Sequence, residues 1–145
     1  MTTVVRSALL AYSAQEIFTL VNDVASYHEF LPFCIASEVL EASDSEMQAR
    51  IAFSRMGMSH SLITRNRLIP HSEISIGFVS GPFEFLRGRW EFRALHASAC
   101  KVSFSVEFQL QAKFLQFAAA SAIHQSVGQT VDAFQRRAVQ VYGQR

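Results

Sequence analysis

The pattern of hydrophobic and polar positions divides the chain into a strand, a helical region, a run of strands and one long helix. Thr2–Ala11 begins rich in β-branched residues and predicts the first strand. Ser13-Ala14-Gln15-Glu16 matches a capping box, and apolar residues then recur every three or four positions as far as Val24. A helix should therefore begin after Ser13. Ser26–Glu29 predicts a second short helical turn, which Pro32 ends.

The middle of the chain is typical of strands joined by turns. Six further strands are predicted, at Ile35–Glu41, Glu46–Arg55, Met58–Ile69, Glu73–Val79, Phe83–Leu95 and Lys101–Gln111. The last has the clearest alternation, with apolar residues on one face and Lys, Ser, Glu and Gln on the other. Pro70 and Ser80-Gly81-Pro82 mark two of the turns. Short strands connected in this way favour a mainly antiparallel meander.

The segment Phe114–Tyr142 predicts one long amphipathic helix. Its apolar stripe comprises Leu115, Ala118, Ala119, Ala122, Ile123, Val127, Val131, Phe134, Ala138 and Val141. Gly128 interrupts it at a cost of about 1 kcal/mol relative to Ala, which predicts a close approach to a neighbouring element. A curved sheet wrapped around this helix would leave an apolar cavity where the facing residues are small. We expect its mouth near Tyr27–Phe33.

Composition narrows the class of protein. Residues 1–145 fit a single domain, half of the residues are hydrophobic and 13 are Phe, which suits either a dense core or a lined cavity. A net charge of +1 carries no electrostatic footprint for DNA. Cys34 and Cys100 lack CxxC partners and are expected as free thiols in the cytoplasm. No apolar run is long enough to cross a bilayer.

Motifs for common chemistries are missing from the sequence. The five histidines form no HExxH or Cys/His ligand set, and there is no G-x-S-x-G, P-loop or GxGxxG. A cyclase would need an acid/base pair converging inside the cavity. Arg65 and Asn66 are the best candidates, but they lie on opposite faces of their strand, and which of them points inward stays open.

The segment 21–34, VNDVASYHEFLPFC, resembles the V-x-D-V-x-x-Y-P-x-F-L-P-x-C signature of the coenzyme Q-binding, START-like family, which includes RatA-type ribosome association toxins. Further matching segments are Arg6-Ser7-Ala8-Leu9, Thr64-Arg65-Asn66, Gly81-Pro82-Phe83 with Gly88 and Trp90-Glu91-Phe92, and Ala133-Phe134 with Val141-Tyr142. Together they cover almost the whole chain. His28 departs from the family, which usually has proline there.

The resemblance implies an α+β helix-grip fold, with a curved antiparallel sheet of six to seven strands around the C-terminal helix and two short helices after the first strand. It implies a cavity for ubiquinone or another lipid, with no required cofactor and no metal. Candidate lining residues are Tyr27, Phe30, Leu31, Phe33, Phe53, Phe78, Trp90, Phe92, Phe104, Val106, Phe108, Ala119, Ile123 and Val127.

Three functions stay open at this point. The first is a non-enzymatic carrier of an isoprenoid quinone or lipid that supports respiration and touches membranes transiently. The second is a RatA-like toxin that binds the large ribosomal subunit and blocks subunit association, for which a localised basic patch is expected from Arg136, Arg137 and Arg145. The third is a polyketide aromatase/cyclase, which the missing acid/base pair disfavours.

Overall fold

The computed structural model describes all residues except 56–57 and 115–118. The strands are β1 (Thr2–Leu10), β2 (Cys34–Ala42), β3 (Glu46–Arg55), β4 (Met58–Ile69), β5 (Glu73–Ser80), β6 (Phe83–His96) and β7 (Ala99–Leu110). The helices are α1 (Ala14–Asn22), the 3₁₀ helices η1 (Val24–Glu29) and η2 (Ala112–Phe114), and α2 (Ala119–Tyr142). The predicted order of elements is confirmed, with boundaries that differ by a few residues. The start predicted for the last helix, Phe114, belongs to η2.

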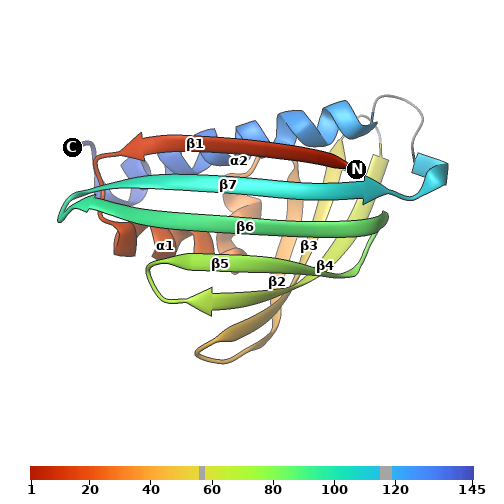
Figure 1. Ribbon diagram of the computed structural model, residues 1–145, viewed down its shortest axis with the longest axis horizontal. Coiled ribbons are helices and arrows are strands. Elements are labelled where there is room, and N and C mark those ends of the chain that lie inside the picture. The colour runs from red at the N-terminus through yellow and green to blue at the C-terminus, as the bar shows by residue number, and fades with distance from the viewer. Residues whose placement is uncertain (56–57, 115–118) are drawn as a thin grey trace.

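The strands of the described chain form one antiparallel sheet in the order β1-β7-β6-β5-β4-β3-β2. Register shifts interrupt the pairing of β2 with β3, of β4 with β5 and of β6 with β7. Such irregularities bend strands and increase their twist. Helix α2 runs along one face of the curved sheet, behind β1 and β7 in Figure 1. The predicted helix-grip architecture is therefore confirmed.

Helix α1 begins where its capping box predicts. The backbone N–H of Glu16 donates to Ser13 Oγ at 3.0 Å, and the backbone N–H of Ser13 donates to Glu16 Oε1 at 2.9 Å. These bonds satisfy two groups that a helix start otherwise leaves unpaired. The helix buries Ile17, Phe18 and Val21 against the sheet and the end of α2. It thus closes one end of the space between sheet and helix.

The apolar stripe predicted for the last helix holds in its described middle part. Val127, Val131, Phe134 and Ala138 are buried. Val141 is half exposed, so its assignment to the stripe is wrong. The neighbouring Tyr142 takes the contact with α1 instead, since its hydroxyl donates to Glu16 O at 2.9 Å.

Two predicted members of the stripe, Leu115 and Ala118, lie outside the described residues, and so does the side chain of Ala119. At Gly128 the predicted close neighbour is a side chain. A Cβ at Gly128 would lie 3.4 Å from Nε of Arg6, and Arg6 also contacts His124.

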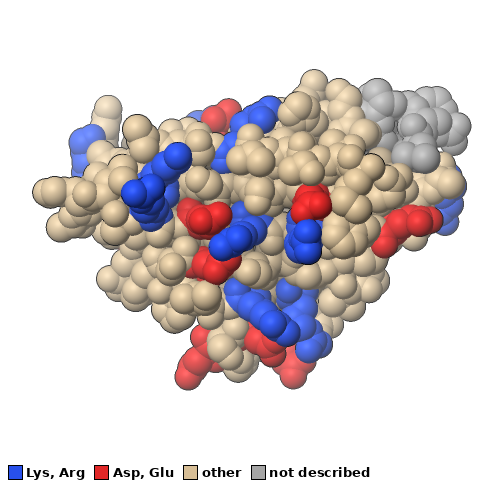
Figure 2. Space-filling view, viewed as in Figure 1, with Lys and Arg blue, Asp and Glu red and all other residues tan. Residues whose placement is uncertain are grey.

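The outer face of the sheet carries charges of both signs. Ion pairs join neighbouring strands there, including Arg87 with Glu107 at 2.7 Å and Arg89 with Glu73. Figure 2 shows the resulting mixture of basic and acidic side chains across this face. Such exposed pairs contribute little stability each, but they neutralise most of one another's charge. The face is therefore polar rather than strongly basic.

The two cysteines are free, as expected, and both are buried. Burial raises the pKa of both thiols. Within the described part of the chain, no helix has the length and hydropathy needed to span a membrane.

Candidate ligand-binding cavity

A cavity of about 600 Å³ lies between the inner face of the sheet and α2. This volume falls within the usual range for small-molecule sites, about 300–1,000 Å³. On one side of it, buried residues of α1, η1 and the C-terminal half of α2 form a packed cluster that includes Ile17, Val24 and Phe134. On the other side a second cluster includes Phe83 and Phe108. The cavity is the part of the interior that neither cluster fills.

Nine of the candidate residues line this cavity. They are Tyr27, Leu31, Phe33, Phe53, Trp90, Phe104, Val106, Ile123 and Val127. They come from η1 and the loop after it, from β3, β6 and β7, and from α2, so the cavity joins segments far apart in the sequence. Their role in binding a ligand stays a prediction.

Four candidates lie outside the lining, each packed against another aromatic ring. Phe92 is buried between Phe18 and Trp90, and Phe108 is buried beside Phe83. Phe78 also packs edge-on against Phe83, with the ring centroids 6.2 Å apart. The fourth, Phe30, packs against Phe134 of α2 and is not part of the lining. The fifth residue without a lining contact, Ala119, has its side chain outside the described residues.

Other residues also line the cavity and are not among the candidates from the sequence, although the sequence leaves an inward orientation open for Asn66. These are Val24, Ala49, Ile51, His60, Leu62, Thr64, Asn66, Ile76, Pro82, Phe83, Leu86, Gly88, Leu110, Ala122, Ser126, Thr130 and Phe134. Strand alternation would have found several of them, since Ala49 and Ile51 share a face of β3 with Phe53. Many of these side chains are short, and a search for bulky aromatic residues passes over them.

The turn η1 is fastened to α2 by both apolar and charged contacts. The ring of Phe30 lies 5.1 Å from that of Phe134, and the guanidinium of Arg137 lies 4.9 Å above Phe30. The same guanidinium pairs with Glu29 at 3.1 Å. The hydroxyl of Tyr27 donates to Val21 O, and burial raises the pKa of that phenol. These contacts fix the wall of the cavity that η1 provides.

His28 is exposed, and it contacts Ser37 of β2 rather than the cavity. Its backbone N–H donates to Ser37 Oγ at 3.2 Å, and its ring Nδ1 is 3.2 Å from the same oxygen. Ser37 Oγ in turn donates to Ala25 O. The residue that departs from the family signature therefore connects η1 to β2.

The open question about Arg65 and Asn66 is resolved by the pairing of β4. Asn66 is 7% exposed and lines the cavity, whereas Arg65 lies on the outer face and donates to Gln48 Oε1 at 3.0 Å. Thr64, also buried in the lining, donates to Asn66 Oδ1 at 3.1 Å. The two residues considered for an acid/base pair are thus separated by the sheet.

Two of the arginines expected to form a basic patch are engaged within the molecule. Arg137 pairs with Glu29, and Arg145 pairs with Glu16 through two bonds of 2.7 and 2.8 Å. Arg136 is exposed on α2. The prediction of a basic patch is therefore corrected, because Glu29 and Glu16 offset the charges of Arg137 and Arg145. Across the described residues, no group of three or more His, Cys, Asp or Glu side chains is arranged to hold a metal ion.

Comparison with known proteins gives consistent results. The family described as polyketide cyclase/dehydrase and lipid transport matches residues 10–135. The chain is 45% identical to the ribosome association toxin RatA of Vibrio cholerae, over 96% of each chain. It is 24% identical to a coenzyme Q-binding protein COQ10 homolog B of Xenopus laevis, covering 96% of this chain and 59% of that protein. The crystal structure of the ZhuI aromatase/cyclase of Streptomyces sp. R1128 matches with a TM-score of 0.87 at 16% identity, over 99% of both chains.

Proposed function

The chain belongs to the polyketide cyclase/dehydrase and lipid transport family and to its RatA-type members, and from this premise we propose that its cavity binds a hydrophobic small molecule without transforming it. The observation that carries the proposal is the cavity itself, about 600 Å³ enclosed mainly by aliphatic and aromatic side chains. Burying apolar ligand surface there gains about 25 cal/mol per Å². An isoprenoid quinone or another lipid has the required chemistry.

The polar groups of the lining support binding rather than catalysis. The hydroxyl of Tyr27 is engaged with Val21 O, and burial raises its pKa, so it is a poor proton donor to a ligand. Ser126 and Thr130 donate to carbonyl oxygens of their own helix. Asn66 and Thr64 do not titrate in the ordinary pH range. Among the described lining residues, His60 and Tyr27 are the titratable side chains, and the Tyr27 hydroxyl is already engaged with Val21 O. General acid/base catalysis needs a titratable pair in reach of the ligand, so this lining supports binding better than paired acid/base catalysis.

A cavity-filling variant tests this proposal. Ala122 lines the cavity from α2, and Ser121 is exposed on the same helix. Ala122→Phe should displace the ligand, so that lipid extraction and mass spectrometry recover less of it than from the unchanged protein. Ser121→Phe adds the same ring outside the cavity and should leave the recovered amount unchanged. Equal recovery from both variants, or no lipid from the unchanged protein together with no binding on titration, would contradict the proposal.

We propose a second function, association with the large ribosomal subunit that hinders subunit joining. The specific observation in its favour is the 45% identity to a protein named ribosome association toxin RatA, over nearly the full length of both chains. Sucrose-gradient profiles after expression should show more free subunits and fewer joined ribosomes. An unchanged ratio would contradict this function. Expressing Ala122→Phe in parallel tests whether the two functions are linked. If this variant changes the sucrose-gradient profile as much as the unchanged protein does, ribosome association does not depend on the cavity.

A further inference from the structure

A buried amide faces the mainly apolar cavity. Asn66 is more than nine-tenths buried and belongs to the lining. Its neighbours across the sheet are Met47 and Ile76, both apolar, so no charged group lies beside it in the pairing. Placing an amide in such surroundings costs free energy unless the amide is hydrogen-bonded. The position therefore calls for partners for both ends of the carboxamide.

One end of this amide has a partner in the protein. Thr64 Oγ1 donates to Asn66 Oδ1 at 3.1 Å, and Thr64 is itself buried in the lining. Because the hydroxyl occupies the carbonyl end, the amide is held with its NH₂ group away from Thr64. Among the residues that the structure describes, none accepts a hydrogen bond from Asn66 Nδ2. Two N–H donors are thus left for whatever occupies the cavity.

The neighbouring polar groups of the lining do not meet this need. Ser126 Oγ donates to Ala122 O at 2.9 Å, and Thr130 Oγ1 donates to Ser126 O at 2.7 Å. The indole N–H of Trp90, another lining residue, also finds no acceptor among the described residues. Asn66 and Trp90 therefore offer donors to a ligand, and a ligand that accepts hydrogen bonds fits them better than a pure hydrocarbon.

We propose that Asn66, oriented by Thr64, recognises a carbonyl oxygen on the ring of an otherwise apolar ligand. This inference rests on the proposed ligand-binding function and specifies the chemistry that the cavity selects. The apolar walls hold the tail and ring faces, and the Nδ2 hydrogens of Asn66 bind the oxygen. Thr64 is a positioning residue, since it acts by fixing the amide. A quinone ring has such an oxygen, and an alkylbenzene of the same length does not.

Two matched probes separate recognition of the oxygen from burial of the chain: 2-decyl-1,4-benzoquinone and decylbenzene. Trp90 is the single tryptophan of the chain and lines the cavity, so quenching of its fluorescence reports quinone binding, and decylbenzene is measured by competition. Asn66→Leu should weaken quinone binding about tenfold, because one hydrogen bond to a buried group is lost. It should leave decylbenzene affinity equal or slightly higher. Ile76→Val, at the adjacent lining position, should weaken both probes by the same factor.

The positioning role of Thr64 has its own readout. Thr64→Val should weaken quinone binding about threefold, and Thr64→Ser, which keeps the hydroxyl, should restore it. Asn66→Ser withdraws the amide while keeping a polar group, and gives the same selectivity test if Asn66→Leu does not fold. If both probes bind and their affinity ratio is the same in these variants as in the unchanged protein, the inference is overturned while the ligand-binding function stands. If neither probe binds the unchanged protein, the proposed function fails and the inference fails with it.

Discussion

The two halves of α2 cover the same sheet but do different things. In the C-terminal half, Phe134 and Ala138 are fully buried against α1, η1 and the sheet. In the N-terminal half, Ala122 and Ile123 are only partly buried and face the cavity. The helix is amphipathic along its length, so the difference arises from what lies opposite. One half meets large side chains that fill the space, and the other meets residues that leave it open.

The comparison shows how one element can serve both stability and binding. Close-packed contacts at the α1 end hold the helix on the sheet, and dispersion and burial there stabilise the fold. A substitution should therefore cost stability at one end and ligand affinity at the other, which the variants below test.

The largest expected effect comes from truncating one isoleucine in the packed cluster and one isoleucine beside the cavity. Ile17 of α1 is fully buried in the packed cluster, and Ile123 of α2 lines the cavity. Ile17→Ala should lower the free energy of unfolding by about 3 kcal/mol, because it opens a new void in a filled core. Ile123→Ala should lower it by about 1 kcal/mol or less, because this side chain is only partly buried and borders the cavity instead of packing on all sides. Urea unfolding followed by circular dichroism measures both.

The matched pair also predicts opposite effects on binding. Ile123→Ala should weaken the binding of 2-decyl-1,4-benzoquinone severalfold, and Ile17→Ala should change it little as long as the protein is folded. Similar stability losses for the two variants would contradict the view that the halves of α2 differ. Such a result would mean that the cavity walls support the fold as much as the packed cluster does.

A smaller contrast lies within the turn that joins the two regions. Leu31 is buried and lines the cavity, whereas its neighbour Phe30 packs on Phe134 outside it. We expect Phe30→Ala and Leu31→Ala each to destabilise the protein by about 2 kcal/mol, since one removes a half-buried ring and the other a buried aliphatic chain. Quinone affinity should fall with Leu31→Ala and stay near that of the unchanged protein with Phe30→Ala. Fluorescence titration and urea unfolding on the same samples separate the two effects, and equal losses of affinity would contradict this division.

The sequence predicts the fold well because local rules carry it. Strand alternation from Val102 to Leu110 places the correct face inward, and the capping box at Ser13 places the start of α1. The cavity is harder to predict because it depends on which residues meet across the sheet and helix. Phe92 and Phe104 share a pattern in the sequence, yet only Phe104 borders the cavity, since Phe18 of α1 packs against Phe92. The inward orientation of Asn66 follows from the register of β4, which strand parity alone left open.

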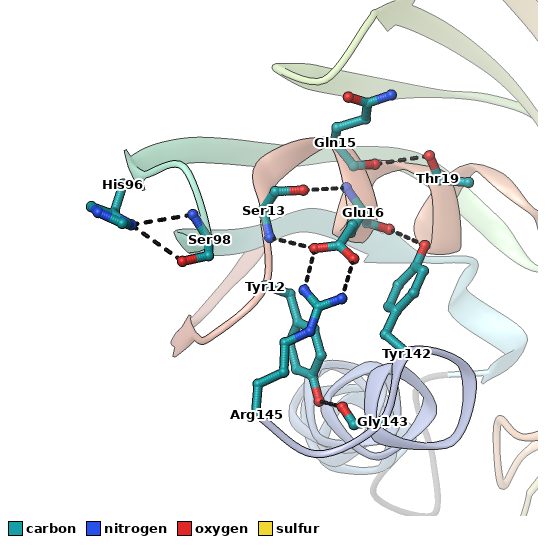
Figure 3. A network of polar contacts seen from close by, with 10 residues as sticks. All are labelled: Tyr12, Ser13, Gln15, Glu16, Thr19, His96, Ser98, Tyr142, Gly143 and Arg145. Carbon is teal, nitrogen blue, oxygen red and sulfur yellow. Dashed lines mark hydrogen bonds and ion pairs between the residues drawn. The ribbon is translucent and has the colours of Figure 1, made fainter.

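The smallest expected effect concerns the ion pair between Arg145 and Glu16, where the C-terminal end of the chain meets α1. Figure 3 shows Arg145 reaching Glu16 of α1, beside Tyr142 and Tyr12. The hydrogen bonds from Arg145, and next the backbone N–H of Ser13, lower the pKa of Glu16 from 4.5 to about 2. A carboxyl group with a lowered pKa in the folded state stabilises the fold above its unfolded pKa. That contribution is lost as the pH falls from about 4.5 to about 2.

Glu16→Gln should therefore flatten the decrease in melting temperature over this pH interval. At neutral pH it should lower the melting temperature by only roughly 1–4 °C, because exposed ion pairs are weak. Glutamine still serves as the third residue of a capping box, so the helix start is kept. Arg145→Gln should flatten the curve less, because Ser13 continues to donate to Glu16, and the double variant should add little to Glu16→Gln. The unchanged protein, the two single variants and the double variant are compared between pH 2 and 5. If the melting temperatures of all four fall in parallel, the ion pair between Arg145 and Glu16 does not stabilise the fold, and the packing around Phe134 holds this end of α2 without it.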